Sequence, residues 1–141
     1  MQDSEPTQAK RARTRAEIGA VIADLVCVVA FTFGGLGAHD ETKSAESTAS
    51  NFFEVVWPYA LSALLVHDLL WRRRVDSRKV WPGGVIALVV VYVLGMAMRA
   101  VTGRGMAVGF LIVAAIFLTV TMLGWRLVWT ALRGRQPSER G

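Results

Sequence analysis

Four apolar stretches, each long enough to cross a lipid bilayer as a helix, occupy most of this chain of 141 residues. A transmembrane helix needs roughly 20 apolar residues to cross about 30 Å of hydrocarbon. The stretches at residues 18–38, 52–70, 80–98 and 106–128 hold about 21, 19, 19 and 23 residues, and the segments between them are too short to form a soluble domain. The sequence therefore predicts an all-α integral membrane bundle of four transmembrane helices.

Two polar tails are expected to flank this transmembrane domain of residues 18–129. Residues 1–17 form a basic amino tail, and residues 130–141 form a carboxyl tail. Both tails are rich in Gln, Ser, Glu, Pro and Arg, a composition typical of disordered segments because it cannot bury apolar surface. We expect the amino tail as far as about Arg15, and the carboxyl tail, to be disordered. The single cysteine, Cys27, lies within the first apolar stretch and excludes an intramolecular disulfide.

The basic residues gather at alternate ends of the predicted helices. Of the 16 Lys and Arg residues, 13 lie in the amino tail, the second connection or the carboxyl end: Lys10, Arg11, Arg13, Arg15, Arg72, Arg73, Arg74, Arg78, Lys79, Arg126, Arg133, Arg135 and Arg140. The first and third connections hold only Lys43, Arg99 and Arg104. The positive-inside rule then places both termini in the cytoplasm. It also argues against dual-topology exporters, which need almost no such bias, and against nucleic acid as a partner, because the basic residues border the membrane.

Ionisable residues near the helix ends carry whatever chemistry this chain performs. Two layers emerge: an inner layer of Asp24, His67, Asp68 and Arg126, and an outer layer of His39, Asp40, Glu54 and Arg99. Asp24 lies about 9 Å inside the membrane, where an unpaired carboxylate is costly. We therefore expect Asp24 to pair with Arg126, and Glu54 with Arg99, as structural ion pairs.

Other uses of these residues are less well supported by the sequence. A proton path needs ionisable groups at mid-depth, and the central third of each predicted helix is almost entirely apolar. His39 and His67 fall at opposite faces of the membrane and cannot share a metal ion. No nucleotide-binding loop, zinc signature or haem attachment motif occurs. We expect no enzyme activity and no cofactor; a transporter using Asp24 is the main alternative, and a lipid-modifying enzyme comes third.

Small residues form a continuous stripe along the first predicted helix. At 100° per residue, six of them fall within about 80°: Gly19, Ala23, Cys27, Ala30, Gly34 and Gly37. Such stripes allow two membrane helices to approach closely. We expect another helix to lie in it. Besides the lipid bilayer, the expected partner is thus another membrane protein or a second copy of this chain.

The order of these landmarks resembles the prokaryotic domain-of-unknown-function family DUF3054 over about residues 18–129. The resemblance is carried by Asp24, residues 35–39, Trp57-Pro58, Gly95-Met96-x-x-Arg99 and Gly124-Trp125-Arg126. Leu36 stands where family members often carry an arginine. The resemblance implies an uncharacterised multi-pass protein of the prokaryotic plasma membrane and supplies no catalytic residue or substrate. Our expectation is a non-catalytic accessory, assembly or stabilising component of a membrane complex, the alternative being a small proton- or ion-coupled transporter or channel.

Overall fold

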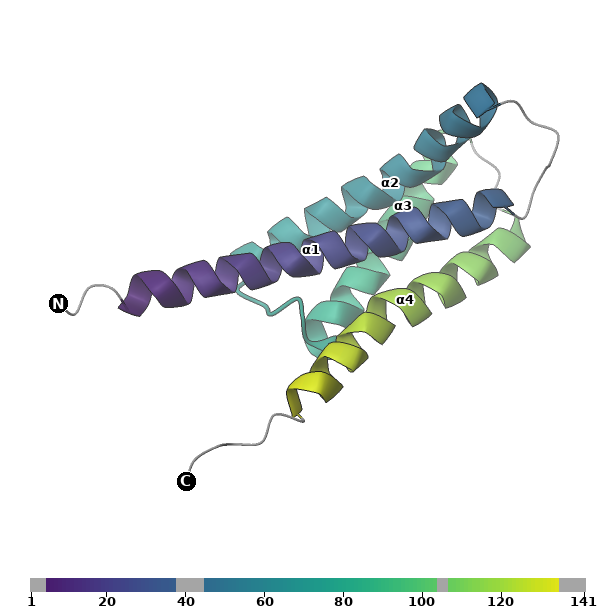
Figure 1. The fold of residues 1–141 in the computed structure, drawn as a ribbon. Coiled ribbons are helices and arrows are strands. Elements are labelled where there is room, and N and C mark those ends of the chain that lie inside the picture. Colours follow the sequence, from purple (N-terminus) through teal and green to yellow (C-terminus); the bar gives the residue numbers. More distant parts are fainter. Residues whose placement is uncertain (1–4, 38–44, 104–106, 135–141) are drawn as a thin grey trace.

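The computed structural model describes residues 5–37, 45–103 and 107–134, and all regular structure within these ranges is helical (Figure 1). The long helices are α1 (Glu5–Gly37), α2 (Ala45–Arg72), α3 (Val85–Val101) and α4 (Val108–Gly134). A short π-type element, η1 (Val80–Gly84), leads into α3 and contains the cis peptide bond Trp81–Pro82. Within the described ranges, four helical segments are long and apolar enough to cross a membrane. The predicted all-α bundle of four candidate membrane spans is confirmed.

The helices extend beyond the apolar stretches from which they were predicted. α1 already begins at Glu5, and α4 continues to Gly134. The expectation of disordered tails is therefore wrong for residues 5–15 and 130–134. The physical reason is that Ala, Gln, Lys, Arg and Glu are good helix formers, and adding residues to an existing helix avoids the cost of nucleation. The apolar stretch marks only the part of each helix that suits the hydrocarbon.

The four long helices pack in a closed ring: α1 contacts α2 and α4, and α3 contacts the same two helices. Successive helices run in opposite directions (Figure 1). The beginning of α1, the connection between α2 and α3, and the end of α4 consequently meet at one end of the bundle. We call this the basic end, because the cations of α1, of residues 72–79 and of the last turns of α4 gather there.

Aromatic and small side chains interlock in the middle of the bundle. Tyr59 of α2 is fully buried, its ring packs edge-on against Phe31 of α1 at 5.4 Å between centroids, and its hydroxyl lies 3.3 Å from the sulfur of Met96. Gly95 of α3 makes room for this ring, because a Cβ there would overlap Tyr59 Cδ1 and lie 2.7 Å from Cε1. Other large apolar side chains, Phe33, Ile116 and Val120 among them, are exposed. An apolar exterior around a tight interior suits lipid as the surrounding solvent.

We predict that both ends of the chain lie in the cytoplasm, since the basic end carries most of the positive charge. Reporter fusions in cells check this. A periplasmic alkaline phosphatase reporter should be active after Ser47 and after Arg104, whereas a cytoplasmic fluorescent reporter should be active after Arg74 and after Gly141. A carboxyl-terminal fusion that reports the outer side would refute the assignment.

Candidate functional site

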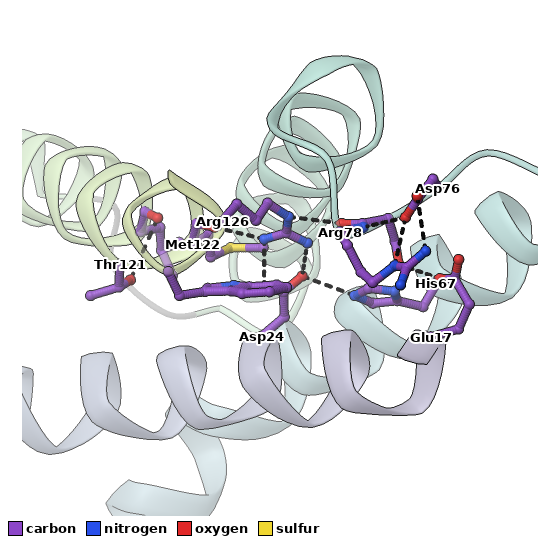
Figure 2. Close-up of polar contacts among 11 residues, drawn as sticks. Glu17, Asp24, His67, Asp76, Arg78, Thr121, Met122 and Arg126 are labelled. Atoms are coloured by element: carbon purple, nitrogen blue, oxygen red, sulfur yellow. Dashed lines mark hydrogen bonds and ion pairs between the residues drawn. The ribbon is translucent and has the colours of Figure 1, made fainter. Parts of the chain in front are cut away.

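The buried carboxylate of Asp24 on α1 is the centre of a polar cluster near the basic end (Figure 2). It faces the guanidinium of Arg126 on α4 in a bidentate ion pair, with Nη1 2.7 Å from Oδ1 and Nη2 2.7 Å from Oδ2. Trp125 Nε1 donates to Oδ1 at 2.8 Å, and His67 Nε2 on α2 lies 2.9 Å from Oδ2. A carboxylate has about four acceptor positions. The carboxylate of Asp24 is therefore saturated, and it joins α1 to both of its neighbours.

The cation of this pair is equally enclosed. Arg126 has no exposed side-chain surface; its Nε donates to the backbone oxygen of Ser77 at 2.8 Å, and Nη1 also donates to the Met122 oxygen at 2.6 Å. Its guanidinium carbon lies 4.4 Å from the centre of the Trp125 ring. Gly84 leaves space for the aliphatic part of the Arg126 side chain, because a Cβ on Gly84 would lie 2.6 Å from Arg126 Cδ. Hydrogen bonds and packing thus fix the position of the Arg126 guanidinium, whose charge Asp24 neutralises.

The buried stripes of the helices bring these residues together. On α4 the buried positions recur every four residues, at Ala114, Leu118, Met122 and Arg126, so the arginine ends an otherwise apolar row. On α1 the buried row includes Glu17, Asp24, Val28 and Phe31. The charged members of both rows lie toward the basic end. Each row thus contributes apolar contacts in the middle of the bundle and charge at one end.

The connection between α2 and α3 extends the cluster toward the basic end. Ser77 is fully buried; its hydroxyl donates to Glu17 Oε2 while its backbone oxygen accepts from Arg126. Beside it, Arg78 donates through Nε and Nη2 to Asp76 at 3.0 and 3.1 Å. Burial alone raises the pKa of Asp76, but hydrogen bonds from Arg78 outweigh it and hold the pKa below its usual value. The same contact raises the pKa of Arg78.

Asp68, expected in the inner layer, does not join the cluster. Its side chain is 57% exposed and pairs with Arg72 one turn along α2, at 2.7 Å. The reason is rotational: Asp68 follows His67 by one residue, or about 100° around the helix. With His67 turned inward to Asp24, Asp68 must face outward.

The outer layer is described only in part. Arg99 lies over the ring of Phe110, with 4.2 Å from its guanidinium carbon to the ring centre. Within the described ranges, its buried Nε and Nη1 have no hydrogen-bond partner. Glu54 is half-buried on α2, and its coupling to Arg99 stays a prediction. His39 and Asp40 lie outside the described residues.

The small-residue stripe of α1 borders α4 without being filled by it. A Cβ on Gly34 would meet only the Phe117 ring, at 3.8 Å, and one on Gly19 would meet nothing within 4 Å. Ala30 is exposed, and Ala23 and Cys27 are half-buried. α1 ends at Gly37, and the surroundings of this last stripe residue lie outside what the structure describes. No described part of the chain lies within 4 Å of a Cβ on Gly19, so the partner helix expected in the stripe stays a prediction.

Several members of the cluster escaped the sequence analysis, Glu17, Ser77 and Asp76 among them. Glu17 carried a usable signal, because it precedes Asp24 by seven residues and so shares its face. Ser77 carried none, since its role depends on the path of the connection between α2 and α3. Among residues 5–37, 45–103 and 107–134, no group of three or more His, Cys, Asp or Glu side chains is arranged to hold a metal ion.

Comparison with models of known protein families identifies a family for this chain. A family model described as "Protein of unknown function (DUF3054)" matches residues 21–129. This range contains most of the apolar part of α1, the apolar parts of the other three long helices and the cluster around Asp24, but not Glu17. No curated protein and no solved structure matches the chain.

Proposed function

The chain belongs to the DUF3054 family, and we propose that it is a non-catalytic accessory, assembly or stabilising component of a membrane complex. We place it in the plasma membrane of a prokaryotic cell, with both termini in the cytoplasm. The observation that carries the proposal is the saturation of Asp24 by donors from α2 and α4.

A group that catalyses a reaction or carries an ion must be reachable by its substrate. The side chains of Asp24 and Arg126 are both 0% exposed, and each oxygen of the carboxylate accepts two hydrogen bonds. Breaking this pair to admit a substrate would leave a buried charge uncompensated, which typically costs several kcal/mol. Such a cluster instead favours a fixed arrangement of α1, α2 and α4, which is what a scaffold for another protein requires.

The outer surface of α1 and α4 supports a helical membrane partner. Beside the small-residue stripe, α4 presents an apolar groove of about 310 Å³ lined by Val113, Ile116, Phe117, Val120 and Thr121. Phe117 also borders the stripe at Gly34, so the two surfaces are continuous. In lipid, close backbone approach at small residues drives helix association, since apolar burial gives no advantage there. The occupant we propose is a transmembrane helix of a different protein.

A transporter is the second candidate, and the position of His67 favours it. His67 contacts Asp24 and also lines an open groove between α1 and α2. A proton entering that groove would reach Asp24 through the imidazole, because either ring nitrogen of a histidine can carry a proton.

One pair of measurements decides between the two candidates. We expect the protein reconstituted alone in liposomes, with a pH-sensitive dye inside, to conduct no protons. We also expect mild-detergent capture to recover one defined membrane protein, which then re-forms the complex from purified components. Gly19→Leu and Gly34→Leu should release it by blocking close approach.

Val93→Phe is the control, because Val93 is exposed on α3, the helix that lies across the ring from α1; it should retain the partner. If capture recovers only a second copy of this chain, the proposed complex with a different protein is wrong and the protein forms a homo-oligomer. Proton flux abolished by Asp24→Asn, with insertion intact, would establish the transporter instead.

A further inference from the structure

A groove of about 260 Å³ opens between α1 and α2 near the basic end, next to the polar cluster, and two residues of the cluster, Glu17 and His67, also line it. It is lined by Thr14, Glu17, Ile18, Val21, Leu64, His67, Asp68 and Trp71. No Lys or Arg is among these residues, although the surrounding end of the bundle is strongly basic. The groove therefore differs in charge from the basic residues around it. It contains two carboxylates and a histidine, and its walls are apolar.

Glu17 supplies an acceptor that the fold leaves unused. The residue is 6% exposed, and only its Oε2 is engaged, by the Ser77 hydroxyl. Oε1 is buried and has no hydrogen-bond partner in the described part of the chain. Arg78 attracts Glu17 electrostatically, but its side-chain hydrogen bonds go to Asp76. A buried carboxylate oxygen without a donor is costly, so a ligand that brings N–H groups would be stabilised here.

His67 adds a second acceptor (Figure 2). Because a carboxylate can only accept, the His67 Nε2 that contacts Asp24 carries a proton. In the neutral ring the other nitrogen, Nδ1, is then an acceptor. Asp68, which also lines the groove, shares its carboxylate with Arg72 at the surface. Glu17, Asp68 and the neutral His67 ring thus give the groove acceptors, while the Thr14 hydroxyl donates to the backbone oxygen of Lys10. Two cations contact the lining: Arg72 pairs with Asp68, and the guanidinium carbon of Arg13 lies 5.9 Å from the centre of the Trp71 ring.

The apolar side chains of the groove lie along the path that the hydrocarbon tail of a bound molecule would take. Ile18 and Val21 follow Glu17 along α1 toward the middle of the bundle, and Leu64 lies one turn before Asp68 on α2 in the same direction. Ile18 and Leu64 are about half exposed to what surrounds the bundle. A molecule with a positive head at Glu17 could therefore lay its apolar tail along the helices without leaving the membrane.

From this juxtaposition we propose that the groove between α1 and α2 binds the primary ammonium group of an amphipathic amine, with Glu17 and His67 accepting its N–H bonds. Two sources share this chemistry: the headgroup of an aminophospholipid in the bilayer, and a free long-chain amine. The inference is independent of the accessory role, because it involves neither the stripe on α1 nor the outer face of α4.

The test uses the full-length protein in nanodiscs of phosphatidylglycerol and phosphatidylcholine, with bound molecules counted by native mass spectrometry. Dodecylamine should be retained about tenfold more strongly than dodecyltrimethylammonium, which has the same charge but no N–H donor, since charge-assisted hydrogen bonds discriminate by roughly that factor. Adding phosphatidylethanolamine should displace dodecylamine if the bilayer lipid is the ligand. A free amine is the ligand if it does not.

Glu17→Gln is the decisive variant, because its amide oxygen can still accept from Ser77 while its NH₂ replaces the free acceptor with a donor. Retention of dodecylamine should fall about tenfold. Glu54→Gln, which removes a carboxylate at the far end of α2, should leave retention unchanged. Leu64→Trp fills the groove at an exposed position and should also prevent binding, so the test does not depend on Glu17→Gln folding. Equal retention of the two cations, or full retention by both groove variants, would overturn the proposal.

Discussion

Asp24→Asn should destabilise the folded bundle by about 3–5 kcal/mol, the typical effect of removing one partner of a buried ion pair. The expected loss is large because the Arg126 guanidinium would stay buried with no counter-charge. Arg126→Gln should have an effect of similar size, since it strands the carboxylate. The free energy of unfolding, measured by thermal or denaturing-detergent titration of the purified protein, checks both values.

The double variant Asp24→Asn with Arg126→Gln shows whether the two residues stabilise each other or contribute independently to the free energy of unfolding. Its destabilisation should be well below the sum of the single effects, because each single change leaves the other charge uncompensated. The exposed pair Asp68 and Arg72 is the matched control, and its variants should change stability by less than about 1 kcal/mol. Simple additivity at Asp24 and Arg126 would show that the two residues do not stabilise each other.

Gly95→Ala should also destabilise the bundle, by about 1–3 kcal/mol, because its methyl group would overlap the ring of Tyr59. The ring cannot retreat easily, since it is fully buried and packed against Phe31. Separation of α2 from α3 is the expected consequence. The melting temperature in a mild detergent measures the effect.

Two further variants make this result specific to the contact. Gly109→Ala introduces the same methyl group into open space on α4 and should not lower the melting temperature. Tyr59→Leu removes the opposing ring, so combining it with Gly95→Ala should cost less than the two single changes together. A Gly95→Ala protein as stable as the wild type would mean that α2 and α3 are further apart than the structure has them.

These predictions bear on function as well as on stability. If the cluster is a structural clamp, variants at Asp24 should lose the partner only to the extent that they lose the fold. A partner that dissociates from a stable Asp24→Asn protein would instead place the carboxylate within a functional contact. The comparison needs only the capture and stability measurements on the same preparations.

The sequence by itself determined the fold class and the positions of the candidate spans, because bilayer thickness imposes a length that apolar stretches must match. It also predicted the pairing of Asp24 with Arg126, since both lie at one depth near the same end and each needs compensation. The helix ends were less predictable. Polar residues 5–17 continue α1 because helix propensity, which does not depend on lipid, extends a helix beyond its apolar part.

Only the tertiary structure decided how each helix is rotated and where the connection between α2 and α3 runs. The rotation of α2 about its axis turns His67 inward and leaves Asp68 outside. The residue types alone do not indicate which of the two faces the interior. The path of the connection brings the Ser77 oxygen to Arg126, and the approach of η1 makes Gly84 the residue that accommodates the arginine. These contacts join residues far apart in the chain, 49 positions for Ser77 and Arg126 and 42 for Gly84 and Arg126. They follow from the packing of all four helices together, which no local pattern of residues records.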